Sequence, residues 1–225
     1  MNYKIFPLLR QYVEVSNIDW IGKMVSVLFL QGCNLNCNYC HNEKLIPLTN
    51  FIQENFYKES KENLINIFDF LEKEKNVLDG VVVTGGEPTI WKDKLYNLLD
   101  KIKNINDKLD IKLDTNGTDI EVVKNCIERN LVDYIAMDVK ANPFDIKNYK
   151  EITEDITDFK LKNILSTVNY INTNNIPHEF RITTNKPKEE LDFLDILNGP
   201  VFLQTIRDEE HKIGQQRIRV DHPRP

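Results

Sequence analysis

The chain has 225 residues, of which 41% are hydrophobic and 28% are charged, and its formal net charge is −6. This apolar fraction excludes a disordered chain, and the length suits one domain of roughly 200–250 residues or two small ones. The acidic balance argues against nucleic acid as the main partner, because proteins that bind polyanions usually carry a surplus of basic residues.

No segment is long and apolar enough to cross a bilayer. The longest apolar run, around residues 25–30, is far shorter than the roughly 18–20 residues that a spanning helix needs. The first residues have neither a long apolar core nor a small-residue cleavage site, as a secretory leader would. We therefore expect a cytoplasmic protein with no membrane partner.

Short apolar runs alternate with amphipathic stretches along the chain. The expected strands are rich in β-branched or aromatic residues and cover 25–30, 81–84, 111–114, 134–139, 178–183 and 201–204. Helical spacing of apolar residues lies between them, at 64–71, 95–102, 123–131, 161–168 and 191–197. This alternation predicts βαβ units that form a parallel sheet covered by helices.

The spacing of the expected strands limits the architecture. They begin about 35 residues apart on average, as expected for βαβ units of roughly 30 or more residues. A closed eight-stranded barrel needs about 250 residues, so the prediction is an incomplete (β/α)6 TIM-like barrel of parallel strands. An open doubly wound sheet is the alternative. We expect a single domain over residues 1–225 with its core at about 16–204, a short strand or hairpin within 1–24, and a polar, weakly structured tail at 205–225 apart from 218–220.

The residues suited to chemistry follow the ends of the expected strands. Ligands of parallel α/β folds bind at the carboxyl ends of the strands, so these residues are expected to meet at one rim. They are Cys33, Cys37 and Cys40 after the first strand, Gly85, Gly86, Glu87 and Pro88 after the second, Asp114 and Thr115 at the third, Asp138 and Lys140 at the fourth, and Arg181 in the fifth.

Three of the four cysteines lie in one short loop, with the spacing Cys33-x3-Cys37-x2-Cys40. A [4Fe–4S] cluster normally takes four thiolates, so three would leave one iron open to another ligand, as in catalytic metal sites. A structural zinc site with His41 as fourth ligand is disfavoured, because Cys40 and His41 are adjacent whereas zinc ligands usually have residues between them. Cys126 lies on an apolar helix stripe, and we interpret it as a core residue.

The cysteine spacing, with Tyr39 before the third cysteine, resembles that of the radical S-adenosylmethionine (radical SAM) enzymes. In that family a segment like Gly85-Gly86-Glu87-Pro88 holds the amino group of the methionine. The resemblance implies that a reduced [4Fe–4S] cluster cleaves S-adenosylmethionine to a 5′-deoxyadenosyl radical, which takes hydrogen from a substrate. The glycines would let the backbone approach the ligand closely, whereas a plain β-turn with an exposed Glu87 is the alternative.

Other motifs resemble the activating enzymes of glycyl-radical enzymes, above all the activating protein of anaerobic ribonucleoside-triphosphate reductase. They are found at 30–34, 40–42, 113–117 and 137–140, and the resemblance covers about 16–204. It implies an anaerobic setting, hydrogen abstraction from a glycine of a partner such as anaerobic ribonucleotide reductase, and an electron donor such as flavodoxin or ferredoxin. No side chain is expected to be catalytic by itself, because the cofactor carries the radical chemistry.

The same resemblance assigns roles to charged residues after the third, fourth and fifth strands. It implies that Asp114, Thr115 and Asp138 hold a monovalent cation and that Lys140 contacts the methionine carboxylate, with Arg181 as a weaker candidate for that contact. Strand capping or a surface ion pair is the alternative for the two aspartates.

Two other functions remain open. One is 7-carboxy-7-deazaguanine synthase, a small radical SAM enzyme, and the other is a non-catalytic iron–sulfur protein. His41-Asn42 after the third cysteine and the Asp138-x-Lys140 motif favour the activating enzyme over the synthase. A missing fourth cysteine disfavours an electron carrier, whose cluster is normally fully ligated by the protein.

Overall fold

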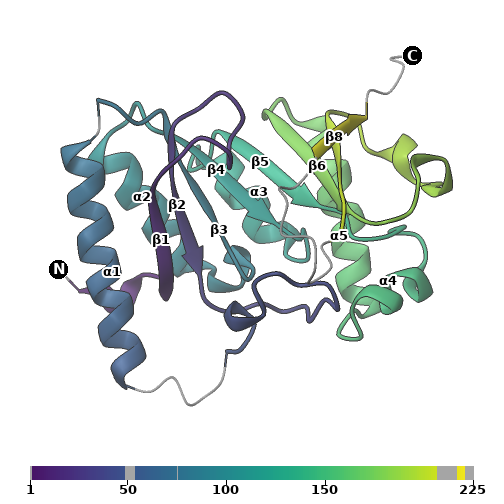
Figure 1. Ribbon diagram of the computed structural model, residues 1–225, viewed down its shortest axis with the longest axis horizontal. Coiled ribbons are helices and arrows are strands. Elements are labelled where there is room, and N and C mark those ends of the chain that lie inside the picture. Colours follow the sequence, from purple (N-terminus) through teal and green to yellow (C-terminus); the bar gives the residue numbers. More distant parts are fainter. Residues whose placement is uncertain (1, 49–53, 75, 207–216, 221–225) are drawn as a thin grey trace.

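The computed structural model describes residues 2–48, 54–74, 76–206 and 217–220, and its strands form one curved sheet (Figure 1). The strands are β1 (Leu9–Ser16), β2 (Val25–Leu30), β3 (Gly80–Gly85), β4 (Asp110–Thr115), β5 (Tyr134–Asp138), β6 (His178–Thr183), β7 (Val201–Gln204) and β8 (Arg217–Val220). The helices are α1 (Glu54–Lys73), α2 (Asp93–Ile105), α3 (Ile120–Glu128), α4 (Ile146–Ile152) and α5 (Asp158–Thr173).

The order of the strands in the sheet follows their order in the chain. Strands β2 to β7 are parallel, and β1 and β8 are antiparallel additions at the two edges. A doubly wound sheet would reverse its strand order at a switch point, and this sheet does not. The prediction of an incomplete TIM-like barrel with six parallel strands is therefore confirmed, and the doubly wound alternative is wrong.

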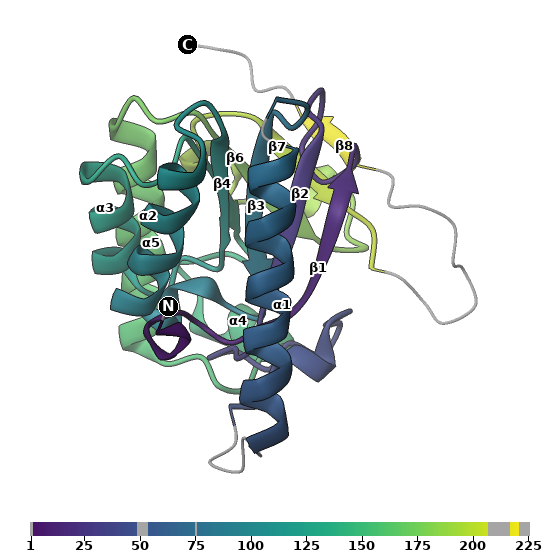
Figure 2. The same ribbon diagram turned by 90° about the vertical axis from the view of Figure 1, so that its left-hand side faces the viewer.

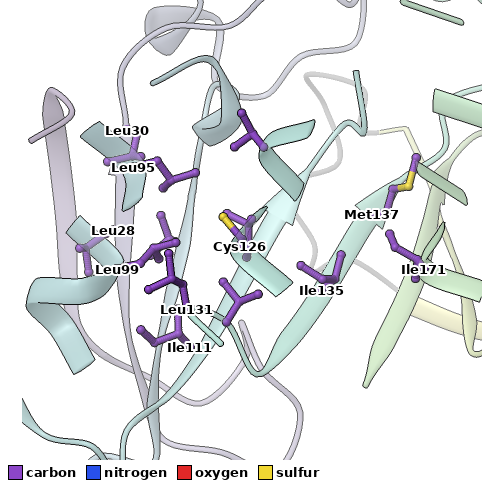
Figure 3. Packing of buried hydrophobic residues seen from close by; sticks show 14 of the residues in the cluster. Leu28, Leu30, Leu95, Leu99, Ile111, Cys126, Leu131, Ile135, Met137 and Ile171 are labelled. Atoms are coloured by element: carbon purple, nitrogen blue, oxygen red, sulfur yellow. The ribbon is translucent and has the colours of Figure 1, made fainter. Parts of the chain in front are cut away.

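Helices α1, α2, α3 and α5 cover one face of the sheet (Figure 2). The main hydrophobic core fills the space between the two layers, and Cys126 of α3 lies within it, fully buried among residues such as Leu99, Ile111 and Leu131 (Figure 3). The opposite, concave face has a smaller apolar cluster around Trp20, Val27 and Val82. Cys126 is thus a packing residue, as predicted, and Trp20 also packs in a hydrophobic cluster.

Two expectations about secondary structure need correction. The apolar spacing at 191–197 does not form an α-helix but accompanies two 3₁₀ turns, Lys188–Glu190 and Leu194–Ile196. Residues three apart share one face in a 3₁₀ helix too, so this spacing does not distinguish the two kinds of helix. Helix α4 was not predicted, although Ile146, Tyr149 and Ile152 recur every third residue along its seven residues.

The two segments outside the parallel strands for which a strand was expected each contain one in the described part of the chain. Strand β1 lies within 1–24, and β8 includes 218–220. Most of the polar tail falls at 207–216 and 221–225, outside the described residues. In the described part of the chain, no helix combines the length and apolar character that crossing a membrane requires.

Candidate active site

A cavity of about 250 Å³ opens at the carboxyl ends of the parallel strands. Every residue that the sequence singled out for the site lines it, except Pro88. Pro88 is instead the buried first residue of a 3₁₀ turn, Pro88–Trp91. The structure therefore brings together predicted site residues from the ends of four strands, β3 to β6, and from the loop after β2, which is dark blue at the lower edge of Figure 1.

Main-chain hydrogen bonds hold the cysteine loop in place. The amides of Gly32 and Cys33 donate to the carbonyls of Leu45 and Ile46, at 2.6 and 3.1 Å. Farther along the loop, the amide of Asn38 donates to Ile152 at the end of α4, at 2.9 Å. The loop is thus anchored on both sides of the cavity by the polypeptide itself.

The three loop cysteines are free, half-buried thiols on the wall of this cavity. Burial, with a further contribution from the charge of Glu87, raises the pKa of Cys33 to about 12, and burial also raises the pKa of Cys37. Thiols in this setting become thiolates when a metal supplies compensating positive charge. Among the described residues, no three His, Cys, Asp or Glu side chains are grouped to hold a single metal ion.

Gly85 and Gly86 join the end of β3 to the cysteine loop. The amide of Gly86 donates to the carbonyl of Leu30 at 2.9 Å, and the amide of Glu87 donates to the carbonyl of Gly32 at 2.7 Å. A Cβ at Gly86 would collide with the Gly32 carbonyl, and one at Gly85 with the backbone of Leu30. Gly85 also has a φ of +137°, which side chains rarely adopt. The close approach that requires these glycines is between two segments of the chain itself.

Glu87 is a buried connector between strand ends and is not an exposed turn residue. Its Oε1 accepts hydrogen bonds from the amide and hydroxyl of Thr89, at 3.1 and 2.6 Å, and from the hydroxyl of Thr115 at 2.8 Å. Its Oε2 accepts from the amide of Asn116 at 2.6 Å. Burial raises the pKa of Glu87, and these hydrogen bonds oppose that shift. Glu87 thereby fixes the end of β4 relative to the end of β3.

Arg181 lies between the two aspartates of the site. Its Nε donates to Oδ1 of Asp138 at 2.7 Å, and its Nη1 donates to Oδ2 of Asp114 at 3.0 Å. Burial by itself would raise the pKa of Asp138, but the positive charges of Arg181 and Lys140 outweigh it and hold this pKa below its usual value. The hydroxyl of Thr115 is used by Glu87. A guanidinium thus lies between the two aspartates for which the resemblance implied a monovalent cation.

Lys140 and Tyr39 place further polar groups on the cavity wall. The Lys140 ammonium lies 3.6 Å from Oδ2 of Asp138. Burial opposes its charge, but Tyr39, Asp138 and Cys37 together raise the pKa of Lys140 well above its usual value. The hydroxyl of Tyr39 and Oδ1 of Asp114 are buried and have no hydrogen-bond partner. Such unsatisfied groups in a native cavity are suited to a polar ligand.

Sequence reasoning missed the polar layer beneath the cavity. Lys112 is 1% exposed, and its ammonium lies 3.4 Å from Glu179, 3.8 Å from Asp114 and 2.8 Å from the carbonyl of Asp19. The sequence could have indicated this, because side chains alternate between the two faces of a strand and Lys112 and Asp114 therefore share one face of β4. Lys112 supports Asp114 from below.

The cavity combines groups that suit a metal cluster and a zwitterion. Three thiols line the same cavity as an ammonium and a guanidinium, which can pair with a carboxylate, and as two carboxylates, which can pair with an amino group. The residues present therefore fit an iron–sulfur cluster beside a ligand with an amino-acid end.

Comparison with known proteins identifies one matching family and several related sequences. The family model described as "Radical SAM superfamily" matches residues 27–198. A putative glycyl-radical enzyme activating enzyme of Methanocaldococcus jannaschii is 37% identical over 191 residues, which are 84% of this chain and 73% of that protein. Another, from Haemophilus influenzae, is 33% identical over 140 residues, 61% of this chain and about half (49%) of that protein.

More distant similarity extends to other proteins. The 7-carboxy-7-deazaguanine synthase of Clostridium acetobutylicum is 26% identical over 176 residues, which are 76% of this chain and 69% of the synthase. The solved structure of anSMEcpe with bound AdoMet has the same fold, with a TM-score of 0.51 and 16% identity over 79% of this chain and 49% of that one.

Proposed function

Since this chain belongs to the radical SAM superfamily, whose enzymes use a [4Fe–4S] cluster and S-adenosylmethionine, we propose that it generates a glycyl radical in a partner enzyme. The observation that carries this proposal is the 37% identity, over 84% of the chain, to a putative glycyl-radical enzyme activating enzyme. We propose anaerobic ribonucleotide reductase as the partner, on the resemblance of the motifs at 30–34 and 137–140.

In this proposal Cys33, Cys37 and Cys40 hold the cluster, and the anchored loop keeps them at the cavity wall. The bound cluster and S-adenosylmethionine supply a carbon radical that can remove a hydrogen atom from a glycine Cα. The protein contributes positioning and exclusion of water, since the radical chemistry belongs to the cofactor.

The cavity residues divide the task of holding the methionine end. Lys140 and Arg181 present positive charge to the carboxylate, and Tyr39 offers a free hydroxyl. Gly85, Gly86 and Glu87 line the cavity beside the cysteine loop, and in this proposal their segment holds the amino end. Because Asp114 and Asp138 already share Arg181, we propose that this guanidinium balances their charge and that no monovalent cation is needed.

A second candidate is the 7-carboxy-7-deazaguanine synthase reaction, which is favoured by the 26% identity to such an enzyme over 176 residues. Two features of this chain speak for the activating enzyme instead: His41 follows the third cysteine, and Lys140 follows Asp138 by two residues.

The decisive experiment is anaerobic incubation of the reconstituted protein with S-adenosylmethionine, a reductant and anaerobic ribonucleotide reductase. We expect 5′-deoxyadenosine by mass spectrometry and a glycyl-radical doublet by EPR, neither of which forms with Cys37→Ala. Turnover of a pterin substrate without the glycyl-radical doublet would show that the chain catalyses the 7-carboxy-7-deazaguanine synthase reaction instead. Tight stoichiometric zinc with no iron–sulfur spectrum would refute both functions.

A further inference from the structure

A groove of about 900 Å³ lies outside the active-site cavity, between residues 2–8, the first half of α1 and the start of α2. Apolar residues including Phe6, Leu8 and Leu64 contribute to its surface, together with Tyr3 and Tyr57. Four lysines also line it, and they are Lys4, Lys58, Lys61 and Lys94. None of the described lining residues is acidic, although the chain as a whole has a net charge of −6.

The positive charge of this groove is not neutralised within the described structure. No Asp or Glu that the structure describes lies within ion-pair distance of the four lysines. Lys61 and Lys94 instead lie over the rings of Tyr3 and Trp91, at 5.8 and 5.5 Å from the ring centres. Glu59, on the same part of α1, is used by Arg10 at 2.8 Å. The lysines are therefore available to an acidic partner.

The groove is joined to the cysteine loop by direct contacts. The carbonyl of Leu8, in the groove wall, accepts a hydrogen bond from the amide of Gln31 at 2.9 Å. The indole of Trp91, beneath Lys94, donates to the carbonyl of Gln31 at 2.8 Å. Gln31 is two residues before Cys33, so their Cα atoms are at most about 7.6 Å apart. Both ribbon views place the N-terminal turn and the start of α1 at the same end of the molecule as this loop (Figures 1 and 2).

We propose that this lysine groove is the docking surface for an acidic one-electron carrier protein that reduces the cluster. The inference rests on the proposed function, because reductive cleavage of S-adenosylmethionine consumes one electron that the chain itself does not hold. One electron passes from the reduced carrier to the cluster, the carrier is oxidised by one electron, and no bond forms or breaks at the groove.

The physical properties of the groove suit such a transient encounter. Positive charge steers an acidic partner and raises the association rate, while the apolar and tyrosine surface provides short-range contact. Weak electron-transfer encounters use small interfaces, so a single groove is a suitable docking surface.

The test compares two double charge reversals. Lys58→Glu with Lys61→Glu changes the groove, and Lys73→Glu with Lys108→Glu makes the same change in charge near the opposite ends of the strands. Cluster reduction is followed by visible absorbance, and 5′-deoxyadenosine by mass spectrometry. The donor is either a reduced acidic flavodoxin or photoreduced deazaflavin, a small reductant that needs no docking surface.

We expect the groove variant to lower the flavodoxin reaction rate at low salt on the order of tenfold and to lose most of its salt dependence. Its rate with deazaflavin stays at the wild-type value, which also shows that the variant is folded, and the control double variant keeps both rates. Equal flavodoxin rates in the two variants would overturn the proposal. It would also be overturned by a groove variant that accepts electrons normally from flavodoxin but no longer activates ribonucleotide reductase, since the groove would then hold that partner. Failure of the proposed function looks different: wild type would form no 5′-deoxyadenosine even with deazaflavin.

Discussion

Replacement of Arg181 by Met removes the charge at the centre of the cavity and keeps a side chain of similar length. Arg181 is 8% exposed and donates to Asp138 at 2.7 Å and to Asp114 at 3.0 Å. The variant leaves both carboxylates without this guanidinium. Lys112 and Lys140 remain, but at 3.8 and 3.6 Å.

The size of the effect follows from the burial of these carboxylates. Removing one member of a buried ion pair costs roughly 3–5 kcal/mol, because it strands an uncompensated charge. The Asp114 side chain is 14% exposed, but Asp138 is 34% exposed, so water screens part of its charge. We expect a loss of about 3 kcal/mol of unfolding free energy at pH 7, or about 6–12 °C in Tm for a domain of this size.

The penalty depends on pH, with a definite sign. In the wild type, the lowered pKa of Asp138 contributes stability above the unfolded pKa of about 3.9, and this contribution is lost as the pH falls through the folded value. Removal of Arg181 takes away the largest contribution that opposes burial, so the pKa of Asp138 rises and the carboxylate takes up a proton at a higher pH than in the wild type. The difference between variant and wild type is therefore smaller at pH 5 than at pH 7.

Urea unfolding of the cluster-free protein under reducing conditions measures this difference. Far-UV circular dichroism and tryptophan fluorescence should report the same transition. The control is Arg129→Met, which removes an exposed guanidinium 4.7 Å from the Tyr96 ring and should cost less than about 1 kcal/mol. A penalty below about 1 kcal/mol for Arg181→Met, or one equal at pH 5 and pH 7, would refute the reasoning.

Three further predictions concern the cluster and the cofactor. Gly86→Ala places a Cβ against the Gly32 carbonyl, so we expect less iron per protein after reconstitution. The control Gly22→Ala has open space around the new Cβ and should keep the full iron content despite a positive φ. Equal iron content in the two variants would contradict this prediction. Cys37→Ala should abolish the iron–sulfur absorbance. Cys126→Ala should preserve it, because Cys126 is buried in the core on the helix side of the sheet. Loss of absorbance in Cys126→Ala would show that the assignment of the cluster ligands is wrong. Exchange of sodium and potassium for choline should leave S-adenosylmethionine affinity, measured by calorimetry, and its cleavage unchanged, and a requirement for either ion would disprove the role given to Arg181.

The parallel strands and the shared rim could be predicted from the sequence because they depend on local patterns. Val25–Leu30 is a short run rich in apolar and β-branched residues, which favours a strand buried on both faces. Once strands and helices alternate, the carboxyl ends of the strands must point to one side, which places Cys33 and Gly85 together.

The charge arrangement of the site could not be predicted in the same way. Arg181, Asp114 and Asp138 come from three strands, and their contacts depend on the curvature of the sheet, which no local spacing specifies. The burial of Glu87 depends likewise on where the end of β4 lies, so the local sequence left an exposed turn residue open as the alternative. The α-helix expected at 191–197 was wrong for a local reason. The three-residue spacing of Leu191, Leu194 and Leu197 fits both an α-helix and a 3₁₀ helix.

The hydrogen bonds of the cysteine loop have a consequence for recovery from oxygen damage. Its two ends are bonded to Leu8, Leu45, Ile46 and Ile152, and the carbonyl of Gly32 is bonded to the end of β3. All of these are contacts within the polypeptide, and none of them requires iron. A molecule that loses its cluster to air therefore keeps the loop folded around the cavity. Rebuilding the cluster in such a molecule would need iron, sulfide and a reductant that keeps Cys33, Cys37 and Cys40 as thiols, but the loop would not have to be ordered again.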